Sequence, residues 1–158
     1  MESSIVPQSH PVGTEVMKEI EELNNIGSAF MKSQVLLVAN YYDLFTRLGE
    51  HCLTPDDMAQ VLGTDRRATR MLLDALVGLE YLEKQKGSYK NSDVSKRLLV
   101  RGSDFYQGDS LRHRYRQWFS WSALREVMKT GSPPDALVAE YPEPEEQRTR
   151  DFLSHVLY

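Results

Sequence analysis

Residues 54–91, TPDDMAQVLGTDRRATRMLLDALVGLEYLEKQKGSYKN, decide the fold. Thr54 is a residue type that caps helix N-termini, and Pro55 suits the first helical position. Asp57 stands three residues after Thr54, where an acidic side chain can complete the cap. These residues predict a short helix that ends at Gly63.

A second helix follows at once, with its cap at Thr64 or Asp65. Its apolar residues recur at the 3.6-residue spacing of a helix and predict a stripe that faces the core: Ala68, Met71, Leu72, Ala75, Leu76 and Leu79. Leu73 and Val77 lie off this stripe, so we expect a second face of the helix to be covered as well. A short helix, a tight turn at a glycine and a longer helix predict a helix-turn-helix.

Two short strands are expected next, at residues 81–84 (YLEK) and 89–91 (YKN), around the loop 85–88 (QKGS). Aromatic and aliphatic residues on both sides of a loop that contains glycine indicate a β-hairpin. The prediction is a mainly α, winged-helix-like fold, with long flanking helices that form an intertwined dimer. Ser92 then caps a brief helix that runs to Leu99.

The helix expected at residues 29–48 is apolar on nearly every side, and this points to a second chain. Such a helix has to be buried on nearly all sides, and a domain of this size has only a modest core. We therefore predict a homodimer, with these dimer-interface candidates: Val35, Leu36, Val38, Tyr41, Leu73 and Val77. A shorter helix should precede, from Thr14 to a stop or kink at Gly27.

A long helix is expected from Asp109 or Ser110 to about Lys129, before Gly131. Aromatic residues at helical spacing are most often core residues, and the basic residues between them suit a solvated side. Some of the rings could instead line an apolar pocket for a planar substrate. The pocket candidates are Phe30, Met31, Tyr115, Trp118 and Trp121.

The predicted layout has three parts. Residues 1–13 are expected to be a flexible tail, and residues 14–134 the winged-helix-like dimerisation domain. Residues 135–158 are expected to be a linker and the start of a helix that leads to an absent catalytic domain. The apolar cluster at the end of the chain is typical of an architecture cut off part-way.

The composition narrows the possible partners. With 158 residues, a net charge of −4 and a pI near 5.6, the chain gives no bulk reason to expect nucleic acid or an anionic membrane. Cys52 is the only cysteine, which excludes an internal disulfide and fits a reducing compartment. No apolar run approaches the ~20 residues of a membrane span, and no signal-peptide pattern opens the chain. A cytoplasmic location is therefore expected.

Motifs for enzyme chemistry are missing together. The sequence has no glycine-rich phosphate loop, no dinucleotide fingerprint and no Gly-x-Ser-x-Gly elbow. The histidines are scattered without the spacing of metal ligands. We accordingly assign no catalytic, cofactor-binding or metal-binding residue.

A DNA-binding transcription regulator is the alternative interpretation of a winged helix. Residues 54–99 hold eight basic and seven acidic residues. Their net charge of about +1 is small for binding to the phosphates of DNA. Arg66, Arg67 and Arg70 favour DNA, whereas Asp74 would repel it. Nucleic acid is thus the less favoured partner.

Five stretches together carry a family resemblance: FMKSQVLLVANYYDLFTRL (residues 30–48), TPDDMAQVLG (54–63), RATRMLLDALVGLEYL (67–82), YKN (89–91) and WFSWSALREVMKTG (118–131). Over residues 29–134 the order of elements resembles the N-terminal domain of S-adenosylmethionine-dependent O-methyltransferases. The hydroxyindole, caffeic-acid and bacterial polyketide-tailoring enzymes are of this type.

The resemblance implies a function. In such enzymes this domain interlocks two chains and forms one wall of the substrate pocket, whereas a C-terminal domain holds S-adenosylmethionine and the catalytic base. We expect the cofactor only with that domain, and the chain alone to be inactive. The substrate would be a small aromatic or hydroxylated molecule. Whether the chain is truncated or a natural stand-alone domain stays open.

Overall fold

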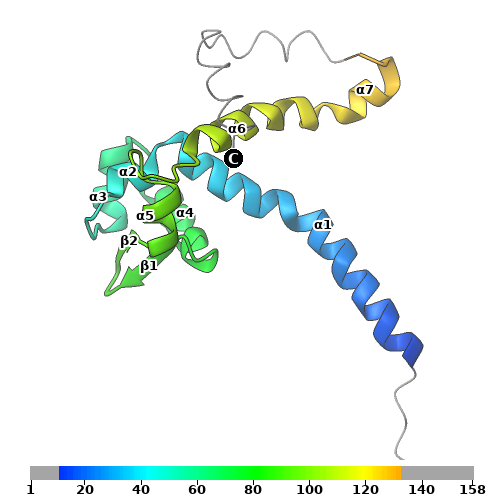
Figure 1. The fold of residues 1–158 in the computed structure, drawn as a ribbon, viewed down its shortest axis with the longest axis horizontal. Coiled ribbons are helices and arrows are strands. Elements are labelled where there is room, and N and C mark those ends of the chain that lie inside the picture. The colour runs from blue at the N-terminus through cyan, green and yellow to red at the C-terminus, as the bar shows by residue number, and fades with distance from the viewer. Residues whose placement is uncertain (1–10, 133–158) are drawn as a thin grey trace, which may run out of the picture. The chain divides into compact units, whose positions relative to one another are not determined.

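The computed structural model describes residues 11–132, and their contacts separate residues 11–33 from the rest. The first unit is the N-terminal part of helix α1 (Pro11–Tyr41). The second unit contains the end of α1 and every later described element (Figure 1). Each unit is described by itself. The linker and helix expected at residues 135–158, and the tail as far as residue 10, lie outside the described residues.

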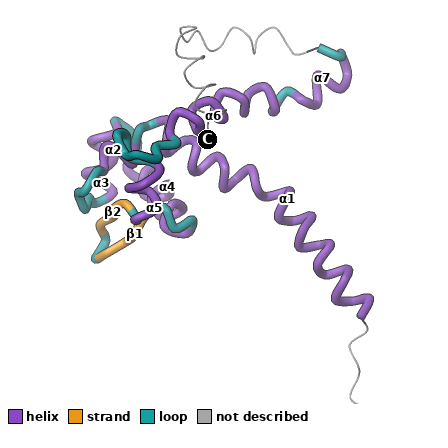
Figure 2. Tube along the Cα trace, viewed as in Figure 1, coloured by secondary structure: helices purple, strands orange, loops and turns teal. Residues whose placement is uncertain are grey.

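Helices dominate the described chain, with one small hairpin between them (Figure 2). After α1 the elements are α2 (Leu44–Leu48), α3 (Pro55–Leu62), α4 (Arg66–Gly78), β1 (Leu82–Gln85), β2 (Ser88–Asn91), α5 (Asp93–Leu98), α6 (Gly108–Ser122) and α7 (Leu124–Thr130). The described part is therefore mainly α, as predicted.

The boundaries of the first helices differ from the prediction. The stop or kink expected at Gly27 is wrong, because α1 runs through it without a break. The helix expected at residues 29–48 is instead divided, since Asp43 adopts the left-handed conformation with φ 54°. Aspartate tolerates that conformation better than most residues. The turn places Leu44 and Phe45 of α2 in the core.

The two helices expected within residues 54–78 form, with the expected end of the first at Gly63. The Thr54 side chain accepts a hydrogen bond from the backbone N–H of Asp57, whose carboxylate accepts one from the backbone N–H of Thr54. Gly63 ends α3 in the left-handed conformation. Asp65, one of the two cap candidates, then caps α4 by accepting from the N–H of Ala68 at 2.8 Å.

The second strand of the hairpin joins it to the preceding part of the second unit. β1 and β2 pair antiparallel, with Leu82 opposite Asn91, and Leu53 forms a bridge with Tyr89 outside the sheet. The buried Asn91 amide donates to the carbonyl oxygens of Phe45 and Gly49, at 2.8 and 2.9 Å. The Phe45 carbonyl also accepts from the backbone N–H of Gly49 at 3.0 Å, so the Asn91 amide adds a second bond there and joins β2 to the end of α2.

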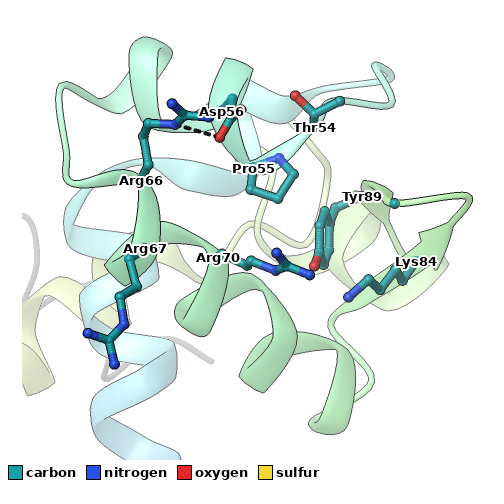
Figure 3. Close-up of a pocket in the computed structure, with 9 residues that line it drawn as sticks. Thr54, Pro55, Asp56, Arg66, Arg67, Arg70, Lys84 and Tyr89 are labelled. Carbon is teal, nitrogen blue, oxygen red and sulfur yellow. Dashed lines mark hydrogen bonds and ion pairs between the residues drawn. The ribbon is translucent and has the colours of Figure 1, made fainter.

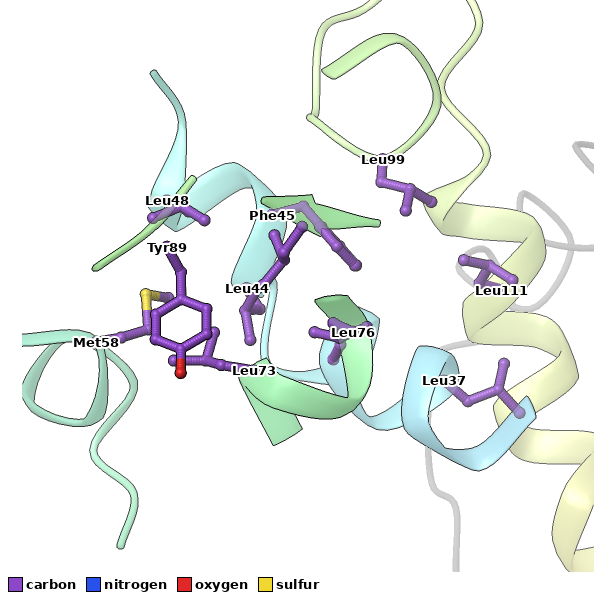
Figure 4. Packing of buried hydrophobic residues seen from close by; sticks show 12 residues of the cluster. Leu37, Leu44, Phe45, Leu48, Met58, Leu73, Leu76, Tyr89, Leu99 and Leu111 are labelled. Carbon is purple, nitrogen blue, oxygen red and sulfur yellow. The ribbon is translucent and has the colours of Figure 1, made fainter. Parts of the chain in front are cut away.

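The core gathers around the hairpin, α2 and α4 (Figure 4). Its largest side chain is Tyr89, whose ring lies beside Met58 and Leu73. Leu99 and Leu111 extend the cluster to α5 and α6. At the end of α1, the Asn40 amide donates to the carbonyl oxygen of Gly108 at 2.9 Å, which ties that helix to the start of α6.

The long helix expected from residue 109 or 110 to about 129 is also divided. α6 and α7 meet at Ala123, whose N–H donates to carbonyls of the preceding turn. The predicted stop is confirmed, because Gly131 ends α7 with φ 73°.

Candidate functional site

An apolar groove of about 630 Å³ opens on the surface of the second unit. The end of α1, the end of α3 and the outer face of α4 form its walls. Its lining is Val35, Val38, Tyr42, Leu62, Gly63, Thr64, Asp65, Ala68, Thr69, Met71, Leu72 and Ala75. Met71 is 63% exposed although it is a large apolar residue. Asp65 brings the only formal charge to the lining, and its carboxylate is held by the α4 cap.

The groove exists because α4 has two apolar faces. Leu73 and Leu76 turn inward and are buried. Ala68, Met71 and Ala75, which were expected to face the core, line the groove instead. The two stripes are offset by one residue, or about 100° around the helix. Periodicity detects both of them, but the side chains packed against α4 decide which one is inside.

This arrangement corrects part of the predicted dimer interface. Leu73 is fully buried in a single chain, so it offers no surface to a partner. Val77 and Leu36 are half-buried against the core. Val35 and Val38 do line the groove. Tyr41 is exposed on the surface and stacks with Tyr115, with ring centroids 5.0 Å apart.

The predicted substrate-pocket residues fall in both units. Phe30 and Met31 lie in the first unit and are about half exposed. Tyr115 and Trp118 are half-buried on α6, whereas Trp121 is 67% exposed. Tyr115 also meets Phe119 edge to face, with centroids 5.7 Å apart. A row of rings from Tyr41 to Phe119 therefore exists on the second unit, and Tyr41 was not among the predicted pocket residues.

A second recess, of about 490 Å³, lies between the start of α3, the start of α4 and the hairpin (Figure 3). It holds four basic side chains: Arg66, Arg67, Arg70 and Lys84. In Figure 3 the Arg70 guanidinium reaches toward Tyr89, whereas Arg67 points away from it. This is the surface on which a DNA-binding helix-turn-helix would depend.

Carboxylates already engage two of these four cations. Arg66 donates to Asp56, with 2.7 Å from Nε to Oδ1, and this hydrogen bond lowers the pKa of Asp56. Lys84 donates to Asp74 at 2.5 Å, and that bond is the main cause of the lowered pKa of Asp74. Both acids stay ionised at neutral pH and offset the basic charge. The net positive charge of the recess is therefore smaller than its four basic side chains suggest.

Residues 11–132 contain neither a metal-binding cluster nor a membrane-spanning helix. No cluster of three or more histidine, cysteine, aspartate or glutamate side chains is placed to hold a metal ion. No helix in this range is long and apolar enough to cross a membrane.

Comparison with known proteins matches the part of the chain that contains the apolar groove to a known family. Residues 25–101 match the family model described as the O-methyltransferase dimerisation domain. This range holds the whole lining of the apolar groove.

Two curated relatives come from Streptomyces. The chain is 35% identical to the tetracenomycin polyketide synthesis 8-O-methyl transferase TcmO of Streptomyces glaucescens, over 65% of this chain and 31% of that protein. It is 27% identical to the N,N-dimethyltransferase OxyT of Streptomyces rimosus, over 87% of this chain and 42% of that protein. The chain thus spans less than half the length of these relatives.

A solved structure shares the fold. The crystal structure of human N-acetylserotonin methyltransferase in complex with SAM matches 87% of this chain and 44% of its own, with 27% identity and a TM-score of 0.62.

Proposed function

Because residues 25–101 belong to the O-methyltransferase dimerisation-domain family, we propose that the chain forms a homodimer. The two copies would pair through the apolar groove. The observation that carries the proposal is the groove itself, because a single chain leaves Met71 and Tyr42 exposed beside Val38. Continuous apolar surface of this kind marks an interaction site. The helix-turn-helix and hairpin then act as a winged-helix-like scaffold for an intertwined homodimer that buries more than ~2,000 Å².

The test is the oligomeric state of the chain and of a charged variant. Sedimentation equilibrium should show a dimer, and Met71→Asp should raise the dissociation constant at least about 100-fold, because a buried unpaired carboxylate costs several kcal/mol. Val94→Asp is the matched control, since Val94 is also an exposed apolar residue but lies on α5 outside the groove. A monomeric chain at micromolar concentration would overturn the proposal.

The second part of the proposal is a role in an O-methyltransferase. The dimerisation domain would form one wall of the pocket for a small aromatic or hydroxylated substrate. Support comes from the aromatic row of Tyr41, Tyr115 and Phe119 and from the half-buried Trp118. Relatives whose names include acetylserotonin and a tetracenomycin polyketide agree with this substrate class.

Substitution of Trp118 tests the role of the pocket wall. In an O-methyltransferase that contains this chain, Trp118→Ala should raise KM selectively while the dimer stays intact. A loss of folding would assign Trp118 to the core and remove it from the pocket.

The family implies S-adenosylmethionine, but the described residues do not fit this cofactor. Their sheet is a two-stranded antiparallel hairpin, without the parallel strands and glycine-rich loop of a nucleotide-binding fold. We therefore place the cofactor and the methyl transfer in a separate catalytic domain and assign no residue here to either.

A further inference from the structure

The part of α1 between residues 14 and 33 has one face without charge. Along it the residues follow one another at alternating intervals of four and three: Val16, Ile20, Leu23, Gly27 and Phe30. This is the spacing of the seam positions in a coiled coil. Every charged residue of the segment lies off the seam: Glu15, Lys18, Glu19, Glu21, Glu22 and Lys32.

The seam is open to solvent in the first unit. Leu23 is 70% exposed, and Val16 and Ile20 are each 45% exposed. Met17, Ile26 and Met31 flank the seam and are exposed as well. Large apolar side chains along about four turns of one helix are a surface that a partner is expected to cover.

Gly27 lies in the middle of this seam, and no contact among the described residues explains why glycine stands there. Glycine inside a helix is destabilising relative to alanine. Gly27 is not among the described glycines with a positive φ, and a Cβ built there would meet no atom within 4 Å. Neither backbone conformation nor packing within the described chain requires glycine here. A backbone that passes close by from outside would require it.

We propose that the seam packs against the same seam of a second copy, with the two helices crossing at Gly27. The inference rests on the proposed dimer and names a second contact in it. A two-fold axis places one patch against itself, which an uncharged patch tolerates. The match to the dimerisation domain begins at residue 25 and so includes Gly27. Without side chains at the crossing, the helix axes can approach more closely than the usual 8–10 Å.

Addition of one methyl group tests the crossing. Gly27→Ala in the 158-residue chain should raise the dimer dissociation constant at least tenfold, while helical content by circular dichroism stays equal or increases. Gly78→Ala is the matched control, because Gly78 is also a helical glycine with open space at its Cβ position but lies on α4. An unchanged or lower dissociation constant for Gly27→Ala would overturn the inference.

Disulfide trapping gives an independent readout. Cys52 is exposed, so it is first replaced by serine. At concentrations above its dissociation constant, Gly27→Cys should then oxidise to a covalent dimer, because the two Cα atoms at the crossing fall within disulfide reach. Asn25→Cys should not, because Asn25 lies about 160° around the helix from Gly27.

The possible results separate the two proposals. If the unmodified chain is a monomer, the proposed function and this inference both fail. If it is a dimer that Met71→Asp dissociates, but Gly27→Cys forms no covalent dimer, only the crossing at Gly27 is wrong. A covalent dimer formed equally by Asn25→Cys would also contradict the seam.

Discussion

At the residue scale, Tyr89 joins the core to the surface of the hairpin. Its ring is buried, and its hydroxyl donates to the Asp74 carboxylate at 2.7 Å. Lys84 lies over the same ring, with Nζ 4.9 Å from the centroid. Tyr89→Phe keeps the ring and removes one hydrogen bond to a charged group. Because the Asp74 side chain is 46% exposed and water can replace the lost donor, we expect the free energy of unfolding to fall by only about 1 kcal/mol. Urea unfolding at pH 7 measures this.

The hydrogen bond between Tyr89 and Asp74 should also make the stability of the fold depend on pH in acid. Hydrogen bonds from Lys84 and Tyr89 hold the pKa of Asp74 below its ordinary value of 3.8 in the folded state. The stabilisation is therefore fully present above that value and is lost as the pH falls through the lower folded pKa. The difference in stability between the native chain and Tyr89→Phe should shrink below about pH 4. A difference that stays constant down to pH 2 would contradict the role of the ionised Asp74.

Two neighbouring residues of α4 test its division into two faces. Leu73→Ala should lower the free energy of unfolding of the monomer by about 2–5 kcal/mol, because the side chain is fully buried. Met71→Ala should change it by no more than about 0.5 kcal/mol, since Met71 is exposed in one chain. Both are measured at concentrations where the chain is monomeric. Equal losses would mean that the two stripes are packed alike.

At the scale of elements, two glycines should respond in opposite directions to alanine. Gly63 ends α3 with φ 68°, where a Cβ is strained, so Gly63→Ala should cost about 1–2 kcal/mol. Gly78 has open space and no positive φ, so Gly78→Ala should stabilise the fold by about 0.4–1 kcal/mol. Thermal unfolding of both variants compares them directly.

Local signals in the sequence predicted the elements whose ends are capped by their own residues. The α3 start at Thr54 and the stop at Gly131 depend on neighbouring atoms only, and both are confirmed. The break at Asp43 was missed because aspartate adopts the left-handed conformation only occasionally, so its residue type alone does not predict a break. The opposite error occurred at Gly27, where a glycine without a positive φ leaves the helix intact.

At the scale of the whole molecule, the candidate interface was only partly predictable. Val35 and Val38 were predicted and line the groove, whereas Met71 and Ala75 were assigned to the core. A single helix shows two apolar stripes but not which of them the rest of the chain covers. The groove also needs Leu62 from α3 and Tyr42 after α1, and only the folded chain brings these together.

The final prediction follows from a dimer that is part of the folded state. At concentrations above the dissociation constant, dissociation accompanies unfolding, so the melting temperature should rise with protein concentration by about 3 °C for each tenfold increase. Met71→Asp prevents dimerisation and should make the melting temperature independent of concentration. Val94→Asp should keep the same rise of melting temperature with concentration as the native chain. A native chain whose melting temperature stays constant between 1 and 100 µM, about two decades of concentration, would contradict the proposal that a second copy covers the apolar groove.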